Sequence, residues 1–396
     1  MNSYIKHLLK KYLPFYIVLF AVCISIFFIY LTIDNNVYSK PSEDVNYYIT
    51  SPYSGLLIFI IPLAFVSIFA PIFANTYRYS IKSVDVFYQT GKGSRQIRLM
   101  NNLTLLISII VSYTAAFIIA IVIMFFKQLA TAGKEVVTDY GSVNIYIMFN
   151  FGYYFLAYFL AVIVCAVNYF ISYYFITRAN NPINSIICLI LGHMLLSALV
   201  MTPIWYASII NTLFSDIPAF YNANILLGTR VPSIIGPIAL ITNIFEPLIV
   251  SGEPLNLVIT SDDVFSLILS IFCVLLFFAI GASSIFAFIK ERESSGELAG
   301  KPEGRDKLQM VIFHIGAGLI FFWSGIANGF ISVFAVVSVF TTISSFVMLC
   351  AVYYVFYGLI RRNFKLKKSD FAILIPVASV YILSAISYNI IVAAAN

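Results

Sequence analysis

Residues 78–102 carry the most informative pattern of side-chain types in this chain. Polar side chains recur there at helical spacing, at Arg78, Lys82, Asp85 and Gln89. An opposed apolar stripe consists of Ile81, Val84 and Tyr88, and Gly91 follows it. This periodicity predicts a short amphipathic helix that ends at Gly91. Such a helix offers polar contacts and packed anchors, so it either docks on a soluble partner or rests on lipid.

The groups that catalysis usually requires are sparse. The three histidines, His7, His193 and His314, are isolated, so neither a zinc pair nor a Ser/His/Asp arrangement can be proposed. No GxxxxGK[ST] phosphate loop occurs, because the segment Gly91–Ser94 lacks the leading glycine. We therefore expect no catalytic, metal or cofactor site, and no ATP hydrolysis by this chain alone. Two of the histidines fall in apolar segments, where a hydrogen bond to a neighbouring helix is the ordinary role and lining a substrate path is the alternative.

The elements that position these residues follow from an apolar composition. Hydrophobic residues make up 61% of the 396 and charged residues only 10%, and mean hydropathy is +0.96. Soluble domains contain roughly 25% charged residues. In hydrocarbon, backbone groups must be paired internally, and near-continuous apolar runs achieve this as helices, whereas barrel strands would alternate. We therefore expect an all-α polytopic membrane protein.

The apolar runs predict nine transmembrane helices. Their expected bounds are Tyr12–Ile33, Ser54–Tyr77, Leu103–Phe126, Phe151–Ile176, Ile183–Tyr206, Val264–Ile289, Met310–Ala327, Phe330–Ile360 and Phe371–Ala395. The five cysteines lie within these runs without metal-ligand spacing, and we interpret them as small buried hydrophobes. The first run is too long for the core of a signal peptide and is expected to remain as a span.

Basic residues sort by loop. Of the 23 Lys and Arg residues, 19 lie in residues 1–11, 78–102, 177–182, 290–309 and 361–370, and the alternate loops hold Lys40, Lys127, Lys134 and Arg230. The positive-inside rule makes the first set cytoplasmic. Nine spans then put the N-terminus inside and the C-terminus outside. Anionic lipid explains the net charge of +6 better than nucleic acid does, because the basic residues flank apolar helices.

Three segments carry further expectations. Residues 1–11 have apolar side chains opposite Lys6 and Lys10, which favours an interfacial helix. Residues 207–263 are apolar but are interrupted by prolines, which favours short broken helices at the outer face over a packed external loop. The span from Phe330 to Ile360 would be about 46 Å long at 1.5 Å per residue, so its end is expected to project into the cytoplasm.

The segment from Arg78 to Asn102 resembles the coupling loop of type-2 ABC exporter permeases. In that family this loop has a short helix with an acidic residue, then a turn and an arginine; Asp85, Gly91 and Arg95 match. The later loop Lys290–Gly304 resembles a signature of the Gram-positive multidrug and peptide branch, at Arg292, Glu297, Ala299, Gly300, Lys301 and Pro302. Residues Tyr353–Lys368 resemble a late cytoplasmic loop of the same branch.

This resemblance implies a domain organisation. Residues 1–11 would be the interfacial helix, and residues 12–289 the six-span core with coupling loop 78–102 and broken external helices 207–263. Residues 290–309 would be a cytoplasmic loop. Residues 310–396 would add three spans, which departs from the basic six-span pattern and leaves the dimer arrangement open.

The resemblance also implies a function. The chain would be the permease subunit of an exporter in the cell membrane, moving an amphipathic or hydrophobic substrate such as a peptide, an antibiotic or a lipid-like molecule. A separate cytoplasmic ATPase would bind the ATP, and a second membrane subunit, identical or related, would complete the complex. Lys82 and Asp85 would supply polar contacts to the ATPase, with Val84 and Tyr88 as the packed anchor.

Two alternatives from other classes remain. One is a membrane-embedded sensor or scaffold that uses the basic loops to hold a regulator. The other is an ion-coupled secondary transporter with binding groups at helix breaks, such as Asn168 or Asn180 to Pro182. The absence of Asp, Glu, Lys and Arg from the interiors of the predicted spans disfavours ion coupling.

Overall fold

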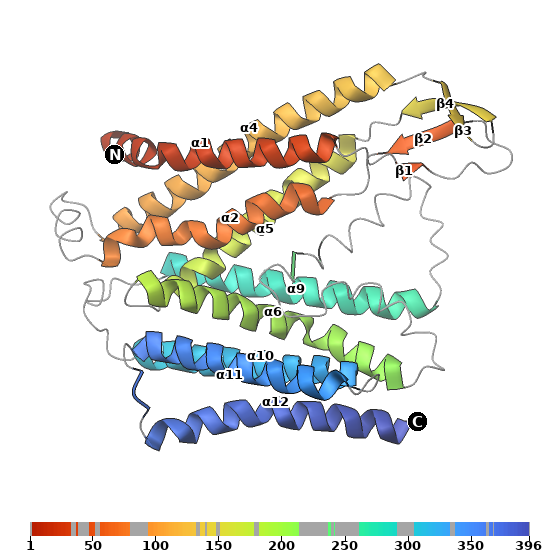
Figure 1. Ribbon diagram of the computed structural model, residues 1–396. Helices are drawn as coiled ribbons and strands as arrows, with labels where there is room; N and C mark the ends of the chain where they lie inside the picture. Colours follow the sequence, from red (N-terminus) through yellow and green to blue (C-terminus); the bar gives the residue numbers. More distant parts are fainter. Residues whose placement is uncertain are drawn as a thin grey trace. The chain divides into compact units, whose positions relative to one another are not determined.

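The structure is a computed structural model, and it is built mainly of long helices (Figure 1). The residues that it describes are 2–32, 37–38, 47–51, 56–79, 94–131, 135–138, 141–147, 151–177, 182–213, 237–238, 241, 261–290, 305–332, 337–361, 364–366 and 368–395. The chain divides into two compact units, and each is described by itself. The described residues of the first unit lie within 2–74 and 94–169, and those of the second lie within 75–79 and 170–395, so one boundary falls after Tyr169 inside helix α5.

The first unit consists of four helices and a small sheet. Its helices are α1 (Asn2–Thr32), α2 (Leu56–Asn75), α4 (Ser94–Thr131) and the first part of α5 (Phe151–Ile176). A 3-10 helix, η1 (Thr76–Tyr79), directly follows α2 in the chain and is assigned to the second unit. The ring of Phe27 in α1 packs on Phe59 of α2 at 5.2 Å between centroids, whereas Phe15 packs on Phe73 at 5.4 Å. The two helices are therefore antiparallel, as expected for consecutive membrane crossings.

An aromatic core holds the first unit together. Tyr113 of α4 stacks on Phe117 and on Tyr158 of α5, with centroids 5.8 and 6.1 Å apart. The hydroxyl of Tyr113 also donates to the carbonyl of Phe59 at 2.8 Å, one turn before Pro62 in α2. Pro62 lacks the N–H that would bond to the carbonyl of Ile58, so the hydrogen-bond ladder of α2 is interrupted at this turn. This bond therefore ties α4 to α2 where the helix ladder of α2 is interrupted.

A four-stranded sheet accompanies these helices in the order β1-β2-β4-β3. Its strands are β1 (Val37–Tyr38), β2 (Tyr47–Ser51), β3 (Glu135–Thr138) and β4 (Gly141–Ile147). Strands β2 and β4 pair in parallel, and the other two pairs are antiparallel. The strands come from two segments that lie outside the predicted spans, so the expected all-α architecture applies to the spans and the sheet is an unpredicted addition.

The second unit is helical in the residues that are described. It contains the end of α5 together with α6 (Pro182–Leu213), α9 (Ser261–Lys290), α10 (Arg305–Ser332), α11 (Val337–Arg361) and α12 (Lys368–Ala395). Its core lies among α6, α10, α11 and α12, around Phe313, Phe321 and Tyr381. Phe313 packs on Tyr353 and Phe321 on Phe346, which makes α10 and α11 antiparallel (Figure 1).

Six helices are long and apolar enough to cross a membrane, judged by length and composition within the described part of the chain. They are the apolar stretches Tyr4–Ile29, Arg95–Phe126, Tyr154–Ile176, Pro182–Val200, Ile268–Lys290 and Asp370–Ser387. The other three predicted spans coincide with α2, α10 and α11, whose described apolar stretches are shorter. These helices indicate a membrane-embedded protein, whereas nine crossings remain a prediction.

The structure corrects several expected boundaries. Helix α10 continues through Asn328 and Gly329 to Ser332, so the break expected at those two residues is wrong. Helix α11 has 25 residues and measures roughly 38 Å at 1.5 Å per residue, which removes the expected overlong span. A lone polar residue and a glycine do not end a helix when tertiary packing supports it.

Other helices extend beyond the apolar runs from which the spans were predicted. Helix α4 begins at Ser94, so residues 94–102 of the expected cytoplasmic loop are helical. Residues 2–11 are helical and continue into the first predicted span without interruption, and their interfacial position stays a prediction. Helix α6 extends to Leu213, whereas most of the rest of 207–263 lies outside the described residues.

Candidate functional site

The residues predicted to contact an ATPase fall mostly outside the described part of the chain. This applies to Lys82, Val84, Asp85, Tyr88 and Gly91. It applies equally to the later loop motif, Arg292, Glu297, Ala299, Gly300, Lys301 and Pro302. Arg95 is described: it is exposed in the first turn of α4. The predicted coupling helix is therefore untested, and the structure locates one of its expected contact residues.

A buried polar cluster lies one turn beyond Arg95. Arg98 is 1% exposed, and Asn101 and Asn102 of the same helix are also buried. The hydroxyl of Tyr4 in α1 donates to Oδ1 of Asn101 at 2.8 Å. The hydroxyl of Tyr169 in α5 lies 3.0 Å from Oδ1 of Asn102 and 3.2 Å from its carbonyl oxygen. Two asparagines of α4 thus hold the start of α1 and a late turn of α5.

Sequence reasoning missed this cluster, because hydropathy put residues 94–102 in a loop. A signal was present. Arg98, Asn101 and Asn102 are spaced i, i+3 and i+4, which places them on one helical face if the helix already includes them. Nδ2 of Asn102 also donates to the carbonyl of Arg98 at 2.9 Å, so the cluster is stabilised within α4 as well as across helices.

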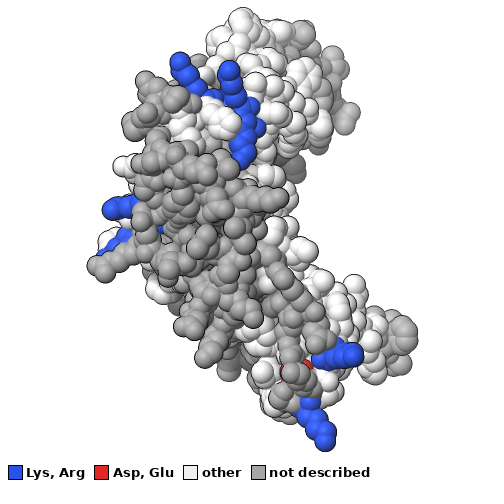
Figure 2. All heavy atoms as spheres, turned by 90° about the vertical axis from the view of Figure 1, so that its left-hand side faces the viewer, with Lys and Arg blue, Asp and Glu red and all other residues white. Residues whose placement is uncertain are grey.

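The described basic side chains all belong to segments that were predicted to be cytoplasmic. They are Lys6, Lys10, Lys11, Arg95, Arg98, Lys290, Lys365 and Lys368, and all except Arg98 are exposed. Figure 2 looks onto a face with several Lys and Arg side chains and little acidic surface among the described atoms. In the first unit these residues lie at the starts of α1 and α4, which the Tyr4 to Asn101 bond brings together. Such a surface favours an acidic protein face or anionic head groups.

His193 has a buried partner in the second unit. Its side chain is 3% exposed, and its Nε2 lies 2.7 Å from Oγ of Ser172 in α5. The ring of Phe175 packs edge-on against the imidazole at 5.9 Å. Both polar groups are enclosed, which fits a structural bond between α5 and α6, the ordinary role expected from the sequence, better than a nucleophile that a substrate must reach.

His314 makes a similar contact between α10 and α11. Its Nδ1 lies 2.7 Å from the hydroxyl of Tyr353. Phe313 stacks on Tyr353 with centroids 5.1 Å apart and an interplanar angle of 12°. The two histidines named as alternatives for a substrate path therefore each bond to a neighbouring helix.

Metal ligation finds no support among the residues that the structure describes, since no group of three or more His, Cys, Asp or Glu side chains comes together there. The five cysteines are free; four are buried and Cys350 is partly exposed. Comparison of the chain with protein-family models, with curated proteins and with solved structures found no match. The likeness to ABC exporter permeases accordingly rests on the sequence motifs alone.

Proposed function

We propose that this chain is the membrane-spanning subunit of an ATP-driven exporter, in which a separate cytoplasmic ATPase supplies the energy and a second membrane subunit completes the translocation path. This proposal rests on the resemblance of residues 78–102 and 290–304 to cytoplasmic loops of type-2 ABC exporter permeases. The chain itself would be non-catalytic, and ATP would be bound by the partner.

The observation that carries this proposal is the position of Arg95. It is exposed in the first turn of α4, within the segment 78–102 that resembles a coupling loop. The buried contacts of Asn101 and Asn102 follow one to two turns later and reach α1 and α5. A displacement of the loop by a partner would therefore reach three helices of the first unit as one rigid movement.

The proposed cargo is an amphipathic or hydrophobic molecule, such as a peptide, an antibiotic or a lipid-like compound. Aromatic residues form 17% of the chain. His193 and His314 each lie within hydrogen-bond distance of a neighbouring hydroxyl group. Apolar surface is therefore the main element that would recognise the cargo.

The decisive experiment is purification of the native complex in mild detergent with identification of its components by mass spectrometry. An accompanying protein with a Walker A motif is the expected result. The variant Asp85→Arg with Tyr88→Ala should lose this protein and the ATP-dependent transport. Arg95→Glu should weaken both, whereas Lys6→Glu, an equally exposed charge reversal at the start of neighbouring α1, should not. An intact chain without any such ATPase, or a double variant that retains it together with transport, would overturn the proposal.

A further inference from the structure

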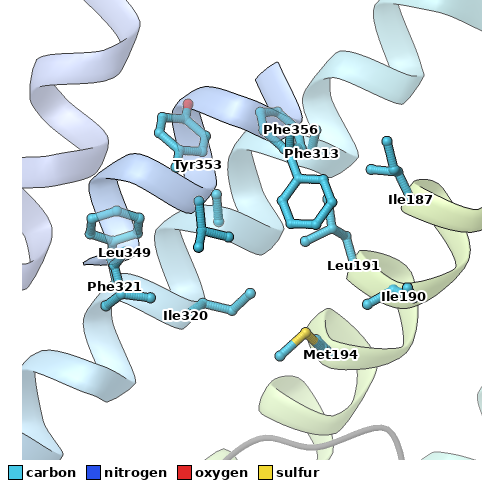
Figure 3. A pocket seen from close by; sticks show the side chains of 12 residues that line it. Ile187, Ile190, Leu191, Met194, Phe313, Ile320, Phe321, Leu349, Tyr353 and Phe356 are labelled. Carbon is cyan, nitrogen blue, oxygen red and sulfur yellow. The ribbon is translucent and has the colours of Figure 1, made fainter. Parts of the chain in front are cut away.

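A cavity of about 220 Å³ lies between helices α6, α10 and α11 of the second unit. Figure 3 shows side chains of α6, including Leu191 and Met194, across from those of α10 and α11. The volume of this cavity exceeds the roughly 150 Å³ of an engineered apolar cavity that stays dry and binds benzene. Space of this size in a core represents lost packing energy unless another group fills it.

The chemistry of the walls selects an apolar occupant. Of the side chains that line the cavity, Tyr353 alone carries a hydroxyl, nitrogen or oxygen group, and that hydroxyl is engaged by Nδ1 of His314 at 2.7 Å. A bound water needs two to four polar partners, which these walls do not provide. A polar ligand would lose its hydrogen bonds to water without replacement. Hydrocarbon fits, because Phe313 and Phe321 give broad apolar contact.

The cavity opens toward the outside of the helices. Its floor is buried at Leu191, Phe313 and Phe321. Its rim includes Met194, which is partly exposed, and Val352, which is 41% exposed on α11. An exposed apolar face of a membrane-embedded helix contacts lipid tails, so the material at the mouth of the cavity is hydrocarbon.

Basic side chains lie in the segment that follows the C-terminal end of α11. The segment after α11 folds back on it, because the hydroxyl of Tyr354 donates to the carbonyl of Phe364 at 2.6 Å and the two rings pack at 6.2 Å. Lys365 directly follows and is exposed, as is Lys368 at the start of α12. The cavity residue Phe356 lies five residues before the end of α11 at Arg361, so these lysines belong to the segment that leaves this end of the helix. An amphiphile with its tail in the cavity would therefore have cationic groups for an anionic head beyond that end of α11.

We propose that this cavity binds an acyl chain of an anionic membrane lipid, which enters sideways from the bilayer and places its head group near Lys365 and Lys368. The bound chain restores contacts that the three helices do not make with one another. It serves as a structural ligand of the second unit. The proposal does not depend on an ATPase partner.

Photolabelling in vesicles tests this site. The full chain is reconstituted with phosphatidylglycerol or phosphatidylcholine that carries a photoreactive diazirine in one acyl chain, and labelled peptides are located by mass spectrometry. The expected result is labelling at residues 187–194 or 313–321, several-fold stronger from phosphatidylglycerol. Ile320→Trp, at the partly exposed rim, should reduce it roughly tenfold, which corresponds to about 1.4 kcal/mol, because the larger side chain fills part of the cavity.

Two further variants keep the result interpretable. Val347→Trp places the same bulk on an exposed face of α11 outside the cavity and should leave the labelling unchanged. Lys365→Gln with Lys368→Gln should remove the preference for phosphatidylglycerol. Labelling spread evenly over exposed helix faces, an unchanged pattern in a folded Ile320→Trp protein, equal labelling from both lipids, or labelling by a hydrophobic peptide but by neither lipid would overturn the proposal.

Discussion

The contact between Ser172 and His193 shows how this membrane-embedded chain handles polar side chains. Both groups are buried, and they meet at 2.7 Å between α5 and α6. A buried polar group left without a partner costs about 1–3 kcal/mol in soluble proteins. Bonds between membrane helices average only about 0.6 kcal/mol and reach about 1.7 kcal/mol, because alternative partners exist in the unfolded state. The bond therefore adds a modest stabilisation and a fixed register.

A double-mutant cycle measures that contribution. Ser172→Ala should lower the free energy of unfolding in mixed micelles by about 1 kcal/mol, because it leaves Nε2 of His193 without this partner. His193→Leu removes the other partner. The double variant should lose less than the sum of the two, with an interaction energy between about 0.6 and 1.7 kcal/mol. Strictly additive losses would show that the two side chains do not stabilise one another.

At the scale of elements, Gly325 allows helix α10 to approach α12 closely in the second unit. A Cβ atom at Gly325 would overlap Oγ of Ser384 and the carbonyl oxygen of Tyr381. Membrane helices lack a hydrophobic drive toward one another, so they associate through such close packing of small residues. In the same helix, Gly318 has open space around the position of a Cβ.

These two glycines make a matched pair. Gly325→Ala should destabilise the protein by about 1–3 kcal/mol, because backbone atoms of α12 cannot rotate away from the added methyl group. Gly318→Ala should be neutral or stabilising by up to about 1 kcal/mol, since alanine favours the helix. Thermal unfolding of both variants in the same detergent distinguishes the cases. Equal melting temperatures would show that α10 and α12 do not pack this closely.

At the scale of the whole molecule, the predicted topology requires each predicted span to cross the membrane. Helix α4 has 38 residues and so measures about 57 Å, which exceeds a hydrocarbon core of roughly 30 Å. Its two ends should therefore lie in water on opposite sides. The basic residues at its start mark the predicted cytoplasmic side.

Cysteine labelling tests this arrangement. In a variant whose five native cysteines are replaced by alanine, new cysteines at Lys10 and Arg95 should react with an impermeant maleimide only in inverted vesicles. A cysteine at Ala130, exposed near the other end of α4, should react only from outside intact cells. Labelling of positions 95 and 130 from the same side would contradict a crossing by α4.

The centres of the helices could be predicted from sequence because hydropathy is a local property. Their ends could not, since packing decides them. Helix α10 passes through Asn328 and Gly329, which look like a break in the sequence, and it packs on α12 about one turn earlier, at Gly325. Helix α4 begins nine residues before its apolar run because Tyr4 and Tyr169 cover its polar face.

The candidate sites were predictable to different degrees. The position of His193 and His314 within predicted spans correctly favoured bonds to neighbouring helices, and each of these two has one. The cavity could not be found from sequence, because its walls come from segments as far apart as residues 187–194 and 349–356. Loop motifs suggested a partner, and Arg95, which is exposed, belongs to both the first of these motifs and the described residues.

The charge of Arg98 matters during insertion into the membrane, and its burial matters in the folded protein. In the predicted topology Arg98 is one of the cationic residues that keep the segment before α4 on the cytoplasmic side during biosynthesis, and for this purpose any positive charge suffices. Only after α1 and α5 have assembled around α4 does its side chain become enclosed. A single residue thus links orientation in the membrane, fixed early, to the completed packing of the bundle.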